Sequence, residues 1–423
     1  MVRICQPKPR YRLLKTTRKT YSVLFLALSC LLISACHRGP KQFDPRQVDF
    51  TVEYNPLFDN QLYPALILGL NQSNVNASLP IFTIEVTAPR DNSVLRVVID
   101  SSSLNYVTIL QEILPHRGET YTFSNPSVKW KYDVIRRLRQ PGVADLTFTC
   151  YINDEEVDIK NLHLSYRTVN ECPLSLQYEG HTYDFRWLFA AYVNEDHPYI
   201  EQILNDIIAQ GNVSRLAGYQ GGRAQVRDQV FAVWYYALDH GITYSSITCT
   251  SNPSPRANVQ HIRFFDEVYN NRQANCVDAC VFLASILRKI GIKPIIFVEP
   301  CHAYLGYFTD KNRKDIALLE TTITSWVNFP DLERSLDANG QLPEAQFNKV
   351  KKYLSENDIA LYREGRLPFD QLKVSVARSL FDKATEYDRE TFTANRSHFA
   401  DTNSITYQQL DIEQLRKIVQ PIN

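Results

Sequence analysis

The stretch from 275 to 322 most constrains the fold, because it joins a helix start to two strands. Apolar residues recur from position 276 to 290 in steps of four, three, four and three, which fits one face of a helix. Asn275 is a suitable N-cap, and Gly291 is a suitable C-terminal stop. The pattern places Cys276 in the first turn, where free N–H groups and the helix dipole stabilise a thiolate.

Two strands, 302–308 and 316–322, are predicted after this helix, with a polar turn between them. One register of the hairpin places Thr322 opposite His302, and a turn that is one pair tighter places Glu320 there. Because strand side chains alternate, both registers keep His302 and Glu320 on the same face. A thiol, an imidazole and a carboxylate in these places fit a nucleophile, its base and an orienting acid.

Two other interpretations of these residues are open. Asp310 in the predicted turn is an alternative to Glu320 as the acid. A zinc site is the other, since a cysteine pair at helical spacing and a Cys-His pair supply suitable ligands: Cys276, Cys280, Cys301 and His302. The apolar helix stripe already accounts for Cys280, so we predict no metal and no cofactor.

The stretch resembles the transglutaminase-like superfamily of cysteine hydrolases and acyltransferases. The resemblance rests on NCVDACVFLASILRKIG at 275–291, HAYLG at 302–306 and LETT at 319–322. It implies a papain-like core in which a helix that carries the nucleophile packs on an antiparallel sheet. The implied roles are Cys276 as nucleophile, His302 as base, Glu320 as orienting acid and Asp278 as a structural partner.

The sequence departs from the usual pattern of this superfamily at three positions. Glu320 stands where aspartate is more common, Asn275 where glycine is common, and Cys280 where alanine is usual. The oxyanion of an acyl intermediate also needs hydrogen-bond donors. We expect the backbone N–H of Cys276 to be one donor. A side-chain amide is a usual second donor in papain-like sites, and Gln260 is the candidate, although it fits an ordinary loop position as well.

Residues 1–35 are predicted to be a bacterial lipoprotein signal peptide. A basic segment precedes an apolar stretch that is short for a membrane span. The stretch ends in Ile33-Ser34-Ala35-Cys36, which resembles the lipoprotein box, and a plain signal or an uncleaved anchor is the alternative. Lipid on Cys36 would tether the chain to a membrane through the polar segment 36–46. His37 in the second mature position resembles proteins of the outer membrane in enteric bacteria, so we expect the cell envelope.

The charge balance argues against nucleic acid as a partner. The 423 residues include 46 basic and 46 acidic ones, but residues 1–35 hold seven basic residues and no acidic residue. The rest of the chain is therefore acidic overall, whereas phosphate binding favours a basic patch.

The fold class predicted for the whole chain is α+β. Region 47–170 has short β-rich segments, 65–70 among them, separated by turn-rich spacers, which predicts an immunoglobulin-like β-sandwich. The transglutaminase-like domain follows over 171–330, and 331–423 is expected to be an α-rich extension that packs on it. Helices are predicted at 381–394 and 411–419, among others. Cys150 with Cys172 is the one disulfide candidate.

Two functions from different classes fit these features. The first is a thiol enzyme that cleaves or transfers at amide bonds of peptides, proteins or cell-wall peptides through an acyl-enzyme at Cys276. The second is an inert binding or structural lipoprotein on the same fold, since a fold does not fix a function. The presence of the cysteine, the histidine and the acid favours the enzyme.

Overall fold

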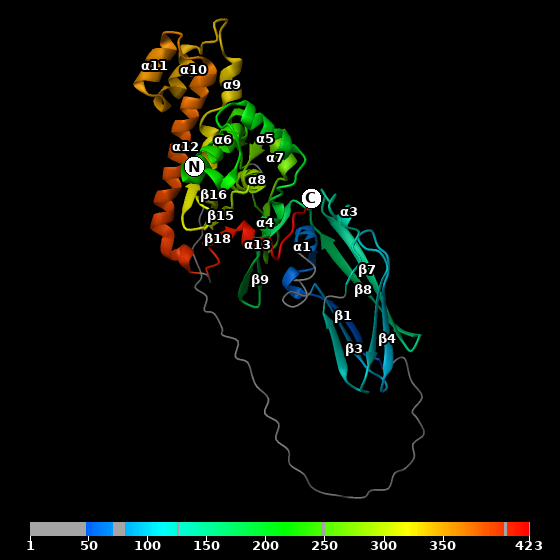
Figure 1. The fold of residues 1–423 in the computed structure, drawn as a ribbon. Helices are drawn as coiled ribbons and strands as arrows, with labels where there is room; N and C mark the ends of the chain where they lie inside the picture. The colour runs from blue at the N-terminus through cyan, green and yellow to red at the C-terminus, as the bar shows by residue number, and fades with distance from the viewer. Residues whose placement is uncertain (1–47, 71–80, 125–126, 247–249, 402–403, 423) are drawn as a thin grey trace, which may run out of the picture.

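The computed structural model describes residues 48–70, 81–124, 127–246, 250–401 and 404–422 (Figure 1). The expected signal peptide, the lipidation of Cys36 and the tether lie outside the described residues. Helices occur together with several sheets, which confirms the predicted α+β class. Within these described ranges, no helix has both the length and the apolar character needed to cross a bilayer.

Two sheets share a core in the N-terminal part of the chain. One has the strand order β1 (Phe50–Tyr54), β3 (Phe82–Thr87), β6 (Thr120–Ser124). The other has the order β2 (Gln61–Leu62), β8 (Glu155–Tyr166), β7 (Gly142–Ile152), β4 (Ser93–Ile99), β5 (Thr108–Leu114). The ring of Phe82 lies 6.0 Å from that of Phe148, and Trp130 stacks on Phe82. Inward-facing aromatic side chains thus join the two sheets.

Two predictions for this part are wrong. Residues 65–69 belong to helix α1 (Pro64–Gly69) rather than to a strand, and only Leu70 is extended. All six helix residues are buried, so the apolar run has no polar alternation that would distinguish a strand from a helix. Strand β5 is not evident from the sequence, because its apolar residues Ile109 and Ile113 face solvent. Cys150 and Cys172 are both buried and free, so the disulfide does not form.

Helix α8 (Cys276–Lys289) lies at the centre of the second part, with residues 277–287 buried. It packs against β15 (Pro294–Glu299) and β16 (His302–Phe308). The antiparallel sheet that contains these strands has the order β17 (Ile316–Leu319), β16, β15, β18 (Gln408–Asp411). Four further helices contact α8: α4 (Phe189–Tyr192), α5 (Tyr199–Ala209), α6 (Gly222–Asp239) and α7 (Phe265–Asn271).

Two smaller sheets lead the chain toward α8. The first has the order β10 (His181–Asp184), β9 (Glu171–Tyr178), β13 (Ala257–His261), β12 (Thr250–Ser254). The second pairs β11 (Thr243–Tyr244) with β14 (Gln273–Ala274) in parallel. Short helices between the strands are η2 (Pro56–Phe58), α3 (Tyr132–Ile135), η3 (Arg186–Leu188) and η4 (Gly218–Gly221). Because β14 ends directly before the N-cap of α8, these sheets fix where that helix begins.

The C-terminal part is a helical lobe whose chain returns to the central sheet (Figure 1). It contains η5 (Thr322–Trp326), α9 (Phe329–Arg334), α10 (Glu344–Val350), η6 (Lys351–Tyr353), α11 (Glu356–Arg363) and α12 (Phe369–Ala400). The long helix α12 contacts β17 and α6. The helix predicted over 411–419 is wrong in extent, because β18 pairs with β15 and only α13 (Ile412–Leu415) is helical.

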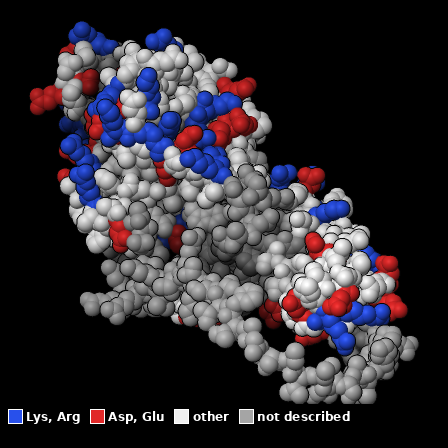
Figure 2. All heavy atoms as spheres, turned by 60° about the horizontal axis from the view of Figure 1, so that its bottom comes forward, with Lys and Arg blue, Asp and Glu red and all other residues white. Residues whose placement is uncertain are grey.

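Charged side chains join the helices of this lobe to the core. Figure 2 shows basic and acidic side chains side by side over much of the lobe. Arg227 of α6 lies 2.5 Å from Asp382 of α12, and Arg378 of α12 lies 3.1 Å from Asp228 of α6. The two helices thus exchange ion pairs along their contact.

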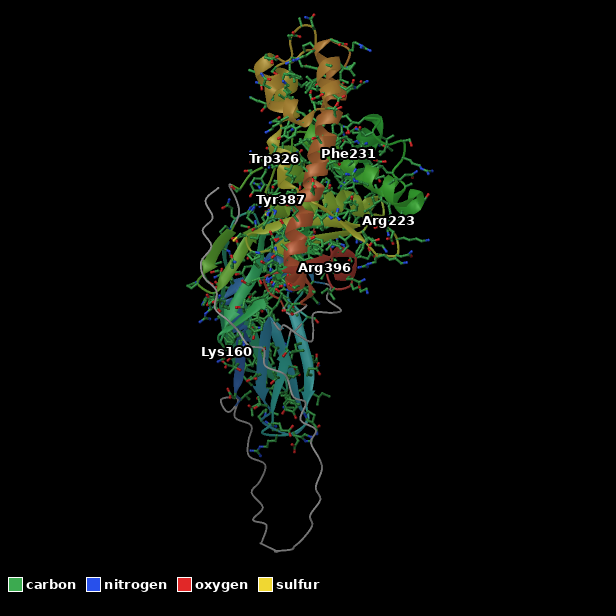
Figure 3. The ribbon with its side chains drawn as sticks, turned by 90° about the vertical axis from the view of Figure 1, so that its left-hand side faces the viewer. Lys160, Arg223, Phe231, Trp326, Tyr387 and Arg396 are labelled. Atoms are coloured by element: carbon green, nitrogen blue, oxygen red, sulfur yellow. The ribbon has the colours of Figure 1, made fainter. Side chains whose placement is uncertain are left out.

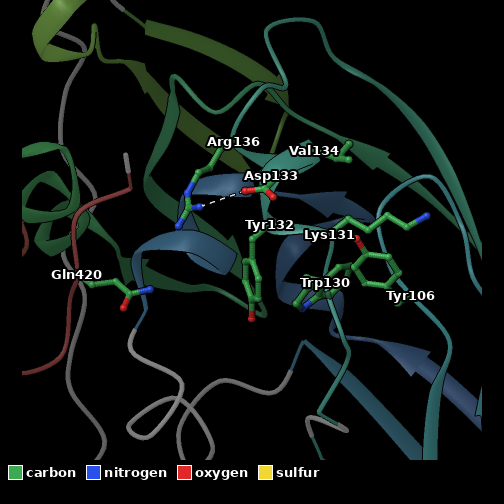
Figure 4. A pocket seen from close by; sticks show the side chains of 8 residues that line it. All are labelled: Tyr106, Trp130, Lys131, Tyr132, Asp133, Val134, Arg136 and Gln420. Atoms are coloured by element: carbon green, nitrogen blue, oxygen red, sulfur yellow. Dashed lines mark ion pairs between the residues drawn. The ribbon is translucent and has the colours of Figure 1, made fainter.

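The end of the chain reaches back to the N-terminal sheets. The side-chain amide of Gln420 donates to the carbonyl of Leu68 (2.9 Å), and Nε of Arg136 donates to the carbonyl of Ile422 (3.1 Å). A cavity of about 620 Å³ lies at this joint, and its lining includes Gln420, Trp130 and Tyr132. Figure 4 shows the side chains that line it. The tail therefore holds the two parts of the chain together.

Candidate active site

A reciprocal cap fixes the start of α8 and presents Cys276 as its first residue. The backbone N–H of Asp278 donates to Oδ1 of Asn275 (2.9 Å), and the backbone N–H of Asn275 donates to Oδ2 of Asp278 (2.9 Å). This is a capping box with aspartate in the third helical position. The Cys276 side chain is half-buried, so its sulfur lies near the surface beside the free N–H groups of the first turn.

Asp278 also binds Arg263, and this pair is buried beneath the site. Oδ1 of Asp278 accepts from the backbone N–H of Arg263 (2.8 Å), and Oδ2 accepts from Nη1 of Arg263 (2.6 Å). Asp278 is fully buried, and Arg263 is 9% exposed. The pair thus joins the segment after β13 to the first turn of the helix that carries the thiol.

The hairpin of β15 and β16 brings His302 to the start of a strand. Glu299 pairs with His302, and Ile295 pairs with Gly306. A Cβ on Gly306 would lie 2.4 Å from a ring carbon of Phe297, so only glycine fits here without displacing that ring. The close approach of Phe297 explains why the alternating strand contains a glycine.

The next strand follows the first of the two predicted registers. Phe308 pairs with Ile316, and Leu305 pairs with Leu319. The predicted strand 316–322 is too long, because β17 ends at Leu319, and the backbone N–H of Glu320 donates to the carbonyl of Ala384 in α12 (3.1 Å). Glu320 therefore lies just past the strand end.

The structure brings Cys276, His302 and Glu320 together. Nε2 of His302 lies 2.7 Å from Oε2 of Glu320, which is 2% exposed. The imidazole also hydrogen-bonds the Cys276 side chain. Since Nε2 is engaged by the carboxylate, Nδ1 is the ring nitrogen left for the thiol. A thiol, an imidazole and a carboxylate thus form a chain of hydrogen bonds that starts at the N-terminus of α8.

The side chains of His302 and Glu320 stabilise each other's charged form. Burial alone lowers the pKa of His302, but the hydrogen bonds and charges of Cys276 and Glu320 outweigh it and raise that pKa to about 11. Burial alone raises the pKa of Glu320, but His302 and Thr322 outweigh it and lower that pKa. The raised pKa of His302 and the lowered pKa of Glu320 therefore favour an imidazolium paired with a carboxylate beside the Cys276 sulfur.

Thr322 holds the carboxylate in place, a role that is not predicted from the sequence. Its backbone N–H donates to Oε1 of Glu320 (2.8 Å), and its hydroxyl donates to the same oxygen (2.7 Å). These two bonds leave Oε2 for His302. A threonine two residues after a carboxylate is a recognisable local signal, because hydroxyl and backbone groups at this spacing often close a small turn.

The other candidate residues occupy different places. Gln260 is buried, and its Nε2 donates to the carbonyl of His261 (3.0 Å). That carbonyl also accepts from Nδ2 of Asn275 (3.3 Å), so Gln260 lies near the start of α8. One of its two amide hydrogens is used there, and its role as an oxyanion donor stays a prediction. Asp310 is not the acid, since it binds Arg223 (3.3 Å).

The alternative zinc set does not come together as a metal site. Sγ of Cys280 lies 4.0 Å from the hydroxyl of Thr321, and Cys301 is exposed on the turn before His302. In the part of the chain that the structure describes, no three or more His, Cys, Asp or Glu side chains are grouped so as to hold a metal ion.

Thr322→Val is expected to lower the second-order rate of Cys276 alkylation at about pH 6 by about tenfold, because a hydrogen bond to a charged group is worth about 1.5–3 kcal/mol. The backbone donor remains, so the loss is partial. Thr322→Ser keeps the hydroxyl and serves as the matched control, with a rate within about twofold of wild type. An unchanged rate in the valine variant, with an unchanged melting temperature, would contradict the positioning role.

No protein-family model matches the sequence. A search of curated proteins found no match either.

Proposed function

We propose that the protein is a transglutaminase-like cysteine hydrolase or acyltransferase that acts on amide bonds of peptides, proteins or cell-wall peptides. The observation that carries this proposal is the hydrogen-bonded series of Cys276, His302 and Glu320, with 2.7 Å between imidazole and carboxylate. A thiol at a helix start, with a base and an orienting acid, is the arrangement that covalent thiol catalysis requires. Lipid on Cys36 would hold this enzyme at a membrane of the cell envelope.

In the first step, the Cys276 thiolate attacks the amide carbonyl carbon, and the carbonyl π electrons move to oxygen. The backbone N–H of Cys276 and an amide hydrogen of Gln260 are the proposed donors to that oxyanion. The C–N bond then breaks, and the imidazolium of His302 gives its proton to the leaving amine. A thioester on Cys276 and a neutral imidazole remain.

The second step depends on the pKa of His302. That pKa is raised to about 11 in part by the negative charge of Cys276. Acylation removes this charge, so the imidazole releases its proton more readily and is neutral when the thioester has formed. It then takes a proton from water or from an amine, which attacks the thioester and returns the thiolate. Water gives hydrolysis, and an amine gives transfer.

The arrangement of elements supports the fold that the proposal requires. Helix α8 packs on the antiparallel strands β15 and β16, with the thiol at the helix start and the imidazole at a strand start. The order β1-β3-β6 opposite β8-β7-β4-β5 supports an immunoglobulin-like sandwich, in which strands A, B and E oppose G, F, C and C′.

The test is to trap the acyl-enzyme with p-nitrophenyl acetate as an activated acyl donor. We expect a burst of about one equivalent of p-nitrophenol and a hydroxylamine-labile acetyl adduct on Cys276, found by peptide mass spectrometry. Cys276→Ala should lose both. Cys301→Ser, which removes the exposed thiol before His302, is the matched control and should keep both. Equal burst and adduct in wild type and Cys276→Ala would reject the enzyme and favour an inert binding protein.

A further inference from the structure

Two short elements meet beside the proposed catalytic residues. In β11, Tyr244 pairs with Ala274, and the next backbone N–H, that of Ser245, donates to the carbonyl of Ala274 (2.8 Å). Cys276 follows Ala274 by two residues. Helix η5 (Thr322–Trp326) begins at the residue that holds the Glu320 carboxylate, and it contacts β11. Strand β11 thus lies against the segment that leads into the nucleophile, and helix η5 begins at the residue that binds the acid.

Both elements expose an aromatic side chain. Trp326 at the end of η5 is 53% exposed, and Tyr244 of β11 is 38% exposed. Figure 3 shows Trp326 on the molecular face where α12 also runs. Trp326 lies four residues after Thr322, which holds the Glu320 carboxylate, and its element contacts β11. A ligand that covers such a ring gains free energy, because burying a large aromatic side chain is strongly favourable.

The chemistry of these segments points to one class of ligand group. Residues 243–246 and 322–326 contain aromatic, aliphatic and hydroxyl side chains and no charged residue. An aromatic or large apolar group gains free energy when it is buried against such a surface. An ionised group would lose hydration against these two segments, which themselves offer no charged side chain to pair with it.

We propose that Trp326 and Tyr244 form the specificity surface of the site and select peptides with an aromatic or large apolar side chain next to the scissile amide. This inference rests on the proposed function. Trp326 would supply most of the contact area, since it is the larger and more exposed of the two rings. The selected side chain belongs to the residue on the acyl side of the scissile amide. The carbonyl carbon of that residue becomes bonded to Cys276 in the thioester.

The test uses three reagents that alkylate Cys276, so it needs no turnover: acetyl-Phe chloromethyl ketone, acetyl-Asp chloromethyl ketone and iodoacetamide. In wild type we expect the Phe reagent to label Cys276 at least about tenfold faster than the Asp reagent. Trp326→Ala should reduce this ratio by about tenfold and leave the iodoacetamide rate unchanged. Tyr106→Ala is the matched control, because it removes another exposed aromatic ring (59%) from the N-terminal part, and should keep the wild-type ratio.

The outcomes separate the two proposals. Failure of iodoacetamide to label wild-type Cys276 at about pH 6 would reject the proposed function, and the specificity surface with it. Two other results are possible when iodoacetamide labels Cys276 fast: the Phe reagent labels it no faster than the Asp reagent, or Trp326→Ala leaves the ratio of the two labelling rates unchanged. Either result would overturn the specificity surface alone. Tyr244→Ala provides a second variant if the tryptophan variant does not fold, and it should lower the same ratio by a smaller factor.

Discussion

His302→Ala is expected to slow the alkylation of Cys276 at about pH 6 by about 100-fold, because an ordinary thiol is almost entirely protonated there. In the wild-type protein the imidazolium lies between the Cys276 sulfur and Glu320, and this neighbour stabilises the thiolate. Removing the ring leaves only the start of α8 to support the negative charge. Mass spectrometry of the Cys276 peptide after timed iodoacetamide treatment measures the rate.

The pH profile of this reaction should also change shape. The pKa of His302 is raised to about 11, so the imidazolium persists through neutral pH. A cation beside the sulfur favours the thiolate, so the wild-type rate should rise less steeply with pH than the rate of an ordinary thiol. The stabilisation that comes from the raised pKa of His302 is present in full below about pH 6.5 and is lost as the pH rises toward 11. The stabilisation that comes from the lowered pKa of Glu320 is present at neutral pH and is lost in acid, as the carboxylate becomes protonated. In His302→Ala the rate should climb about tenfold per pH unit up to about 8.5.

The control for this prediction is a second histidine beside a carboxylate. Nδ1 of His163 lies 2.5 Å from Oδ1 of Asp145 on the exposed surface of β8 and β7. His163→Ala removes a comparable pair far along the chain from Cys276 and should leave the labelling profile unchanged. Identical profiles for wild type and His302→Ala would mean that Cys276 is not activated.

Local periodicity is enough to predict the pairing of His302 with Glu320. The apolar steps after Cys276 identify the helix, and period-two alternation in the strand that contains His302 fixes which side chains share its face. That argument does not need the register of the hairpin, since both possible registers place Glu320 on the side of His302. The part of the site that depends on short-range geometry was therefore predictable.

The rest of the site depends on contacts between residues far apart in the sequence. Strand β17 ends at Leu319 because the N–H of Glu320 bonds to Ala384, 64 residues later, and nothing in 316–322 signals that contact. Strand β18 is likewise defined by its pairing with β15, as Leu410 meets Ile296. The role of Arg263 also depends on such a contact, because its partner Asp278 belongs to another element.

Asp278→Ala is expected to destabilise the protein by about 3–5 kcal/mol, because it leaves the buried guanidinium of Arg263 without its partner. It also removes a member of the capping box of α8, which costs about 1 kcal/mol more. Burial raises the pKa of Asp278 even with three donors around the carboxylate, which shows how costly an enclosed charge is at this position. The free energy of unfolding from urea titration, read at neutral pH, measures the loss.

An aspartate–arginine salt bridge on the surface is the control, because it has the same charges as the Asp278–Arg263 pair but is not buried. Asp331 pairs with Arg334 on α9, where the side chains are 60% and 68% exposed, and Asp331→Ala should cost less than about 1 kcal/mol. If Asp278→Ala cost no more than this control, the buried pair would not hold the helix start. If Asp278→Ala cost several kcal/mol and also slowed Cys276 labelling in the fraction that remains folded, the pair would both stabilise the fold and position the nucleophile. The two effects are expected together, because the same carboxylate caps the turn that begins at Cys276.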